Sequence, residues 1–353
     1  NGASEMTTTD PSAGGAAATK VADSGAALLA PPVGERRTKG WLEAYALPMA
    51  WVVIIIVFSF VKPETFAQWS NVSSILSSNA VLVVVTLALI IPLTTGDFDL
   101  SVASVAGLSA VTLAHLNVNL HWNIGIAIVM ALLVGLLVGL INGALIVVLG
   151  IESLIVTLGM STIVTGIMLW VTDARTVTGV DPVLVDMVVR NRFLGIPFIF
   201  FYALILTIVV WYVFQHTPLG QRMLVAGRNR DVARLAGMRV GLMRWGAMVA
   251  ASLIAAFAGI LIVGMSASAG PSTGLDYLLP AFAAAFLGST TIKPGRFNAW
   301  GTFIAVYFLV TGITALQLLG AKTFVQYLFY GTALILAVAL SQHIKRRRIK
   351  QGF

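Results

Sequence analysis

Long uncharged apolar runs recur along the chain, and they restrict its fold more than any other feature. An α-helix needs roughly 20 apolar residues to cross a hydrocarbon core of about 30 Å. Runs of about this length follow one another from Ala44 to Leu340. Charged residues make up only 10% of the 353 residues, whereas an average soluble domain carries about 25%. The pattern predicts an all-α polytopic membrane protein and argues against a soluble enzyme.

The apolar runs divide into about ten predicted transmembrane helices, with both termini in the cytoplasm. This arrangement satisfies the positive-inside rule, because 17 Lys and Arg residues fall on the cytoplasmic side and five fall outside. An odd number of spans would place one basic terminus on the wrong side. The predicted spans are 44–61, 75–95, 101–117, 123–149, 153–171, 197–214, 244–265, 277–292, 298–318 and 323–341.

The two ends of the chain lack this apolar pattern. Residues 1–40 are rich in Ala, Gly, Ser, Thr and Pro without periodicity, which predicts a disordered cytoplasmic tail. Residues 41–343 form the predicted transmembrane domain, and residues 344–353 form a basic cytoplasmic tail. The net charge of +8 comes from bases beside the spans, so we expect a lipid bilayer and no nucleic acid as a partner. The chain has no cysteine, which excludes thiolate metal ligands.

Two carboxylates interrupt the apolar pattern in the stretch TTGDFDLSVAS, residues 94–104. A charged side chain within a bilayer is costly, so each one marks a candidate functional site. The apolar runs on both sides are short, and the loop carries no Lys or Arg. We therefore predict a break between helices below the membrane surface, buried in protein or lining a wet cavity. The motif residues are Gly96, Asp97, Asp99, Leu100 and Ser101.

Three interpretations of these acids remain open. Asp99 can cap the helix that starts at Leu100, with Ser101 helping to satisfy the free N–H groups. Asp97 and Asp99 can form an Asp-x-Asp metal site, but no other acid or His lies near in sequence to complete it, and we predict no metal. The third interpretation is a structured hinge beside a translocation path.

Two segments in the second half of the chain resemble segments in the first half. The segment PSTGLDYLLPAFAAAFLGS (271–289) again places Thr-Gly before an acid, and the segment from Leu149 resembles the one from Leu319. The offsets are 178 and 170 residues, and each spans five predicted helices. A repeat relating spans 2–5 to spans 7–10 must then be inverted in the membrane. Inverted repeats with broken helices are typical of alternating-access transporters.

The loop after the sixth predicted span, TPLGQRMLVAGRNRDVARLAGMRVGLMR (217–244), carries too many charges to cross a membrane. Its pattern predicts a short helix from Arg230 to Leu235, capped by Asn229 and ended by Gly237. The arginines alone would suit a solvated anchor for the next span, but so short a helix is also an element that a cytoplasmic ATPase would grip. The candidate coupling residues are Gly227, Arg228, Asn229, Arg230, Asp231, Ala233, Arg234, Gly237 and Met238.

Three motifs resemble those of the membrane permeases of bacterial ABC importers for monosaccharides, and they occur along the chain in the same order as in that family. The resemblance is to the ribose/xylose/galactose-type branch, which is related to the type II importer fold. The GIDLSVGS-like motif of that family reads GDFDLSVAS here, with Asp97 and Ala103 as departures. Its coupling motif, Gly-x-Asn-x-x-Ala-Ala-x-x-Ser-Gly-Ile, reads GRNRDVARLAGM at residues 227–238. Its NG…VTLG region resembles residues 141–159, and the likeness extends from Trp41 to Ser341.

This resemblance implies a transport subunit, not an enzyme, in the bacterial plasma (inner) membrane. It implies a second permease copy forming a homodimer around a central path, and an external binding protein that delivers a sugar or sugar-alcohol-like solute. It also implies cytoplasmic ATPase subunits that bind ATP and Mg and grip residues 227–238. The chain itself carries no Gly-x-x-x-x-Gly-Lys-[Ser/Thr] loop, so we expect no cofactor in it and hydrolysis in the partners.

Two further sets of residues are candidates for contact with the solute and the binding protein. Three arginines of the external loop 172–197 can meet acids on a binding protein or pair locally with Asp173, Asp181 and Asp186. Hydroxyls and amides on spans five and ten suit a neutral polyol, although small polar residues also join helices. The docking candidates are Arg175, Arg190 and Arg192, and the path candidates are Thr157, Ser161, Thr165, Asp276, Gln317, Gln326 and Tyr330.

An ion-coupled secondary transporter is the alternative function. It would share the inverted repeat and would use the acids Asp97, Asp99 and Glu152 for proton or sodium coupling, but it has no need of a coupling helix. A membrane enzyme is disfavoured because the four histidines are scattered along the chain. A channel would show a ring of pore charges or a filter sequence, and the chain shows neither.

Overall fold

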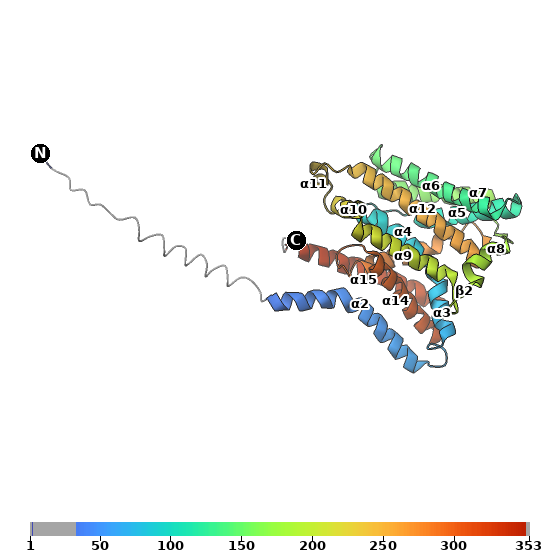
Figure 1. Ribbon diagram of the computed structural model, residues 1–353, viewed down its shortest axis with the longest axis horizontal. Coiled ribbons are helices and arrows are strands. Elements are labelled where there is room, and N and C mark those ends of the chain that lie inside the picture. The colour runs from blue at the N-terminus through green and yellow to red at the C-terminus, as the bar shows by residue number, and fades with distance from the viewer. Residues whose placement is uncertain (1, 3–32, 351–353) are drawn as a thin grey trace. The chain divides into compact units, whose positions relative to one another are not determined.

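The computed structural model describes residues 2 and 33–350 (Figure 1). By its internal contacts the chain divides into two units, Asn1–Glu43 and Ala44–Phe353. Residues 3–32 of the predicted N-terminal tail lie outside the described part, whereas residues 33–40 already belong to a helix. The last helix likewise continues through residues 344–350 of the predicted basic tail.

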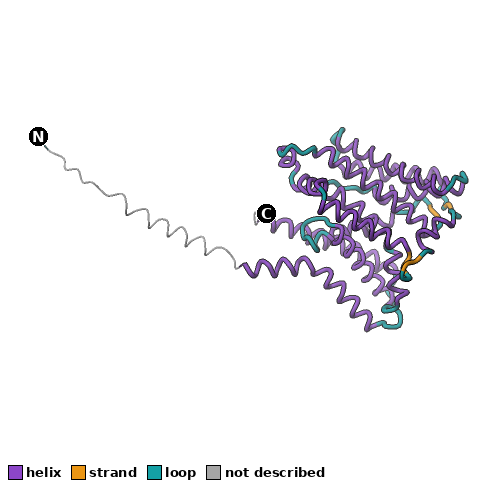
Figure 2. The backbone as a smooth tube through the Cα atoms, in the orientation of Figure 1, coloured by secondary structure: helices purple, strands orange, loops and turns teal. Residues whose placement is uncertain are grey.

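The described chain is almost entirely helical, with four two-residue strands in its loops (Figure 2). The all-α prediction is therefore confirmed. Two single-turn π-helices, η1 (His115–Asn119) and η2 (Asp186–Arg190), and a 3₁₀ turn, η3 (Leu275–Tyr277), extend neighbouring helices. The α-helices are α2 (Val33–Val61), α3 (Trp69–Ser78), α4 (Ala80–Thr95), α5 (Val102–Ala114), α6 (Ile124–Val147), α7 (Ser153–Thr172), α8 (Pro182–Val185), α9 (Phe198–His216), α10 (Pro218–Arg228), α11 (Arg230–Leu235), α12 (Val240–Ser266), α13 (Leu278–Gly288), α14 (Ala299–Leu318) and α15 (Thr323–Lys350).

Nine helical segments among the described residues are long and apolar enough to cross a membrane, so the prediction of ten full-length spans is corrected. Each of the nine overlaps a predicted span, and the second begins earlier than predicted because α3 and α4 join into one segment, Trp69–Thr95. The exception is the predicted span 277–292, where η3 and α13 form only the shorter apolar helix Leu275–Gly288.

The short helix ends early because a polar, Gly- and Pro-containing turn replaces its last part. Ser289–Gly295 form consecutive turns, with the N–H of Gly295 donating to the carbonyl of Ser289 (2.8 Å). This turn reaches the beginning of the first span, where Thr291 Oγ1 and the N–H of Ile292 both donate to the carbonyl of Ala44 (2.6 and 2.8 Å). These hydrogen bonds satisfy polar groups of the non-helical backbone within the protein.

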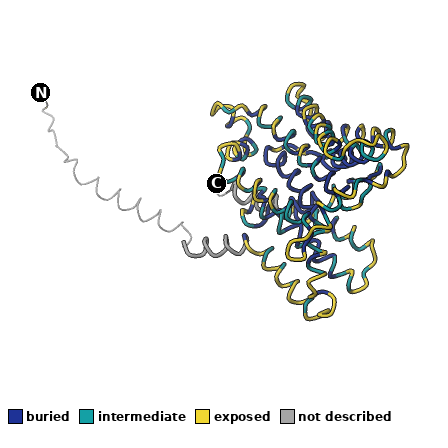
Figure 3. The backbone as a smooth tube through the Cα atoms, turned by 45° about the vertical axis from the view of Figure 1, so that its right-hand side comes forward, coloured by how far each residue is buried: buried dark blue, intermediate teal, exposed yellow. Residues whose placement is uncertain are grey.

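Helix α4 forms the centre of the bundle. All sixteen of its residues are buried, as expected for a helix that is apolar on every side. Helices α9, α10, α12, α13 and α14 all contact it. The tube in Figure 3 shows the buried backbone gathered inside the bundle, with exposed residues on the outer helices. The turn that follows α4 is therefore attached to a helix that is buried along its whole length.

Helices α6 and α12 pack closely because three glycines lie at four-residue intervals on α6. A Cβ at Gly135 would overlap Ala256, one at Gly139 would crowd Ser252, and one at Gly143 would overlap the Trp245 indole. Small residues at this spacing allow helix backbones to approach within a membrane, where apolar surface gives little preference for protein over lipid. This contact fixes the start of α12, which carries Arg244.

The two ends of the bundle carry different elements. At one end, strands β1 (Val177–Thr178) and β4 (Ser268–Ala269) pair antiparallel, as do β2 (Arg192–Phe193) and β3 (Ile196–Pro197). Figure 1 places α10 and α11 at the opposite end of the long helices from α8 and β2. The predicted coupling segment and the predicted external loop therefore lie at opposite ends.

Candidate functional site

The predicted coupling helix exists with the predicted bounds, Arg230–Leu235. The Asn229 side chain accepts hydrogen bonds from the N–H groups of Asp231 (3.0 Å) and Val232 (3.1 Å). Gly237 adopts φ +75°, a left-handed conformation that favours glycine. The N–H of Met238 then donates to the carbonyl of Ala233 (3.0 Å), which closes the helix.

Helix α11 has one buried and one exposed face. Ala233 is fully buried and packs with Ala226 and Val240. On the other face Leu235 is 89% exposed and Val232 is 55% exposed. These two side chains, three residues apart, form a small exposed apolar face on a charged loop. The residue pattern did not single out these two side chains.

The end of α10 lies directly against the end of α4. A Cβ at Gly227 would overlap the carbonyl oxygen of Thr94, so only glycine permits this approach. The neighbouring Gly96 adopts φ +81° and ends α4, with its N–H donating to the carbonyl of Leu93 (3.1 Å). Two glycines of separate predicted motifs, residues 96–101 and 227–238, therefore meet.

Asp97 joins these segments through two arginines. Arg244 of α12 donates to its carboxylate from two nitrogens, Nε to Oδ2 (2.8 Å) and Nη2 to Oδ1 (2.7 Å). Arg230 of α11 donates from Nη2 to Oδ1 (3.0 Å) and to the carbonyl of Gly96 (2.9 Å). The Asp97 side chain is only 2% exposed. We call Asp97, Arg230 and Arg244 the charged cluster.

In the charged cluster, the negative Asp97 carboxylate and the C-terminal end of α4 both favour the positive charges of the two arginines. The two guanidinium groups lie at the C-terminal end of α4, where the helix dipole favours positive charge. A bidentate Arg–carboxylate pair is among the stronger hydrogen-bonded contacts in proteins. Removing one member of a buried pair leaves an uncompensated charge at a cost of about 3–5 kcal/mol. This geometry commits Asp97 to holding α11 and α12 together at the end of α4, and leaves it unsuited to carrying a coupling ion.

Asp99 serves a different purpose from Asp97. The interpretation in which Asp99 caps a helix starting at Leu100 is not met, because α5 begins at Val102 and Ser101 occupies the cap position. Asp99 Oδ1 instead accepts from the N–H (2.9 Å) and Oγ (2.6 Å) of Ser101. Ser101 Oγ in turn accepts from Nδ2 of Asn142 on α6 (2.9 Å). Asp99 thus shapes the turn and connects it to α6.

The second carboxylate oxygen of Asp99 is buried and makes no hydrogen bond. Asp99 lies between the segments that end at Thr95 and begin at Val102. Burial raises the pKa of the Asp99 carboxyl above its ordinary value, which favours the neutral acid. The described residues contain no group of three His, Cys, Asp or Glu side chains placed to hold a metal ion.

Helix α7 fixes the same turn from a third side. Ser153 Oγ accepts from the N–H of Phe98 (3.1 Å), and Thr157 Oγ1 accepts from the N–H of Leu100 (3.0 Å). Thr157 is fully buried in this role. Of the other path candidates on α7, Thr165 donates to the carbonyl of Ser161 (2.8 Å). Helix α7 packs on α5 and α6, away from the remaining candidates on α14 and α15.

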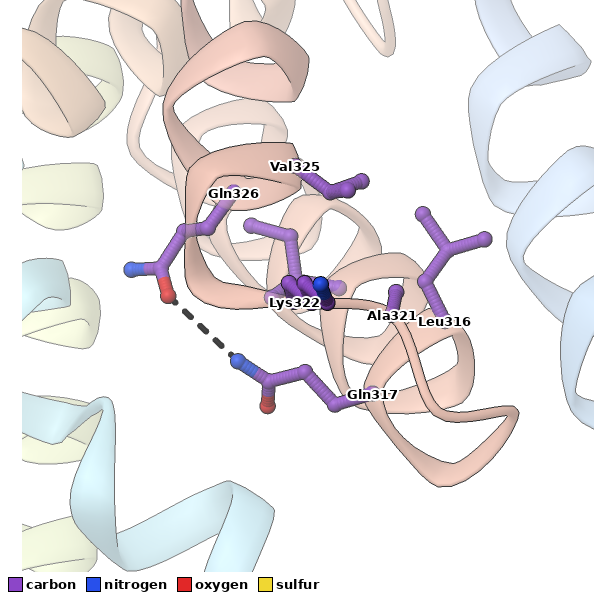
Figure 4. Close-up of a pocket in the computed structure, with 7 residues that line it drawn as sticks. Leu316, Gln317, Ala321, Lys322, Val325 and Gln326 are labelled. Carbon is purple, nitrogen blue, oxygen red and sulfur yellow. Dashed lines mark hydrogen bonds between the residues drawn. The ribbon is translucent and has the colours of Figure 1, made fainter.

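Three other path candidates do come together. Gln317, Gln326 and Tyr330 all line a cleft between α3, α14 and α15. Figure 4 shows the Gln317 and Gln326 side chains facing each other, with a hydrogen bond from Nε2 to Oε1 of 3.4 Å. Asp276, in contrast, is exposed on η3 and does not line this cleft.

The three docking arginines are all exposed at the end of the bundle that carries the strands. Arg190 pairs with Asp186 across one helical turn (2.6 Å), one of the local pairs that the sequence allowed. Asp181 caps α8 by accepting from the N–H of Val183 (2.9 Å). Arg175 lies next to β1, and Arg192 lies in β2.

Arg244 was not found as a site residue from the sequence. In sequence it is one of the 17 bases assigned to the cytoplasmic side, yet it is the closest partner of Asp97. It lies 147 residues away along the chain, so no local spacing could have revealed the pair. The available signal was Asp97 itself, because an acid between two apolar runs requires a positive partner when it is buried.

Comparisons with known proteins agree with the motifs. Residues 71–338 match the family described as "Branched-chain amino acid transport system / permease component". The chain is 32% identical over 291 residues to the ribose import permease protein of Bacillus subtilis, covering 82% of this chain and 90% of the relative. It is 30% identical over 306 residues to the L-arabinose transport system permease protein of Escherichia coli, covering 87% and 92%. No solved structure matches the chain.

Proposed function

Because the chain belongs to the family of ABC-transporter permeases that includes the ribose and L-arabinose permeases, we propose that it moves a monosaccharide into the cytoplasm across a bacterial inner membrane. The chain is the membrane-spanning subunit and not itself an ATPase. The family description names branched-chain amino acids, whereas the relatives named above are sugar permeases. The sugar assignment follows these relatives.

The observation that carries the mechanism is the contact between α11 and the turn after α4. We propose that a cytoplasmic ATPase subunit covers the exposed face of α11, including Leu235. When ATP closes the ATPase pair, α11 moves, and the charged cluster transmits this displacement to α4 and α12. Differential binding of the ATPase to the two positions of α11 would shift the permease between outward and inward access.

An inverted repeat is the proposed basis of alternating access. Gly96 and Gly274, 178 residues apart, both adopt a left-handed conformation, with φ +81° and +89°. Gly150 and Gly320, 170 residues apart, do the same, with φ +72° and +90°. The first residues of α7 and α15, Ser153 and Thr323, also match at the second offset. These matched turns support two halves of related backbone geometry.

The proposed complex contains a second permease copy, two ATPase subunits that bind ATP and Mg, and an external binding protein. Both permease termini and α11 would face the cytoplasm, in line with the distribution of basic residues, with the short apolar helix Leu275–Gly288 serving as a tenth crossing beside the nine longer segments. The exposed arginines Arg175, Arg190 and Arg192 at the other end are the proposed contacts for the binding protein. Because these charges are exposed, we expect them to speed the association of the binding protein with the permease more than they strengthen its binding.

Reconstitution tests this function directly. The permease, its ATPase subunits and its binding protein would be placed in liposomes, and uptake of labelled D-ribose and L-arabinose would be measured. We expect uptake to require ATP and to continue when a protonophore collapses the proton gradient. Uptake that continues without ATP and stops with the protonophore would overturn the proposal in favour of ion coupling.

A further inference from the structure

A cleft of about 290 Å³ lies at the strand-bearing end of the bundle, between α3, α14 and α15. Helix α3 is anchored at this end because Ser73 Oγ donates to the carbonyl of Gly195 (2.9 Å) and Trp69 Nε1 donates to that of Leu194 (3.1 Å). Both carbonyls belong to the turn between β2 and β3. The cleft is therefore far from the charged cluster and lies where a solute would arrive from outside.

The cleft is built from polar positions of three helices. Ser74 and Ser78 lie one turn apart on α3, Thr314 and Gln317 lie one turn apart on α14, and Gln326 and Tyr330 lie one turn apart on α15. Residues at these spacings share one helix face, so each helix turns a polar stripe toward the same space. No Asp, Glu, Lys, Arg or His lines this cleft.

Each of the three helices belongs to an apolar segment long enough to cross a membrane. Uncharged polar side chains in such helices often join helices by hydrogen bonds across them. In this cleft the only hydrogen bond between side chains of two of the helices, among the described residues, is the Gln317–Gln326 contact.

Much of the hydrogen-bonding capacity in the cleft is unused within the described part of the protein. The side-chain hydroxyls of Ser78, Thr314 and Tyr330 make no hydrogen bond to any described residue, although Tyr330 is only 6% exposed. The Gln317–Gln326 contact is long, at 3.4 Å, and can readily be exchanged for contacts to a solute (Figure 4). Ile75 and Ile313 supply apolar surface beside these groups.

We infer that this cleft is an outer binding site for a neutral polyhydroxy solute of monosaccharide size. At roughly 30 Å³ per water molecule its volume corresponds to about ten waters, which is close to the ten to twelve non-hydrogen atoms of a pentose or hexose. Hydroxyls and amides can both donate and accept, as sugar hydroxyls do. The lining of the cleft itself offers a zwitterionic amino acid no charged partner, since the nearby Lys322 lines the adjoining pocket, so an amino acid should be rejected.

This inference rests on the proposed function and specifies the substrate class at one site. The absence of cysteine from the chain permits a direct test by thiol labelling. Ser78→Cys and Thr314→Cys each place a single thiol in the cleft of the otherwise unchanged, full-length permease. Thr178→Cys, in the exposed part of β1 at the same end, is the matched control.

The experiment measures the rate at which a membrane-impermeant methanethiosulfonate labels each variant, with and without D-ribose, L-arabinose or L-leucine. Each cleft variant should label about twofold more slowly when a sugar half-occupies the site, and L-leucine should have no effect. Labelling of Thr178→Cys should not change. Adding Tyr330→Phe should raise the sugar concentration needed for protection by up to about tenfold, the loss expected for one hydrogen bond.

ATP-driven uptake by the same variants separates the two proposals. If uptake is retained but neither sugar slows labelling of either cleft thiol, the cleft assignment is wrong and the transport function stands. Equal protection by L-leucine and by sugars would also overturn it. If a cysteine variant loses uptake, sugar protection of its thiol still tests the cleft independently of coupling.

Discussion

The Asp97 carboxylate and the Arg244 guanidinium form a bidentate ion pair between residues 147 positions apart, with N–O distances of 2.8 and 2.7 Å. Asp97 is 2% exposed and Arg244 is 14% exposed, so neither charge is well solvated. The pair joins the turn after α4 to the start of α12. Arg230 adds a third member from α11.

Replacing either member of this pair alone should strongly destabilise the permease. Asp97→Ala and Arg244→Ala should each cost about 3–5 kcal/mol, because each leaves a buried charge without its partner. The double variant should cost clearly less than the sum of the two single variants. Thermal unfolding in detergent would measure all three. Asp231→Ala is the control, because Asp231 is 86% exposed and its pair with Arg234 should contribute little. Strictly additive losses would argue against the pair.

Leu235→Glu should weaken binding of the ATPase subunit without affecting the folding of the permease. Leu235 is 89% exposed, so a charge there should leave the stability of the permease within about 0.5 kcal/mol. It should nevertheless prevent an ATPase subunit from covering α11, and copurification of that subunit should be lost. Leu194→Glu makes the same change on a 72% exposed leucine at the other end. Loss of copurification in both variants, or in neither, would contradict the assignment of α11.

Substitutions of Asn229, the cap of α11, should reduce transport to different degrees. Asn229→Ala removes the acceptor for two N–H groups and should destabilise this short helix by about 1 kcal/mol. Transport should fall while membrane insertion is retained, since the bundle core is not touched. Asn229→Ser keeps an acceptor and should restore most of the uptake. Full uptake by Asn229→Ala would show that a well-formed α11 is not required.

Gly227→Ala should impair the permease although it adds one methyl group. The new Cβ would overlap the carbonyl oxygen of Thr94, so α10 would have to move away from the end of α4. Overpacking of this kind typically costs about 1–3 kcal/mol. Gly246→Ala on α12 is the matched control, because nothing lies within 4 Å of its added Cβ. Uptake and thermal stability should fall only for Gly227→Ala, and equal behaviour of the two variants would contradict this packing.

Asp97 and Asp99 should respond differently to the same substitution. Asp99→Asn keeps an oxygen that can accept from Ser101 and removes an ionisation that burial already opposes. We expect it to retain stability and transport, whereas Asp99→Ala, which leaves the Ser101 donors without their acceptor, should lose about 1–3 kcal/mol. Asp97→Asn should resemble Asp97→Ala, because its arginines require a negative charge. Thermal shift and uptake assays on the four variants would check this, and intolerance of Asp99→Asn alone would refute the proposed roles.

The sequence by itself determined the features that depend on neighbouring residues. Apolar length located nine spanning helices, and the Asn229 and Gly237 signals gave α11 its observed bounds. These succeed because backbone hydrogen bonds, caps and membrane thickness act over a few residues or one span. The predicted span 277–292 was too long because it included Ile292 beyond the polar residues Ser289, Thr290 and Thr291, whereas the helix ends at Gly288.

Only the tertiary structure decided which distant groups meet. It assigned Arg230 and Arg244 to Asp97, placed Thr157 beneath the turn after α4, and gathered Gln317, Gln326 and Tyr330 with the polar face of α3. Each of these outcomes depends on how whole helices pack, set by contacts such as the glycine approach of α6 to α12. A buried charge must find a partner, but its own sequence neighbourhood does not specify which helix supplies it.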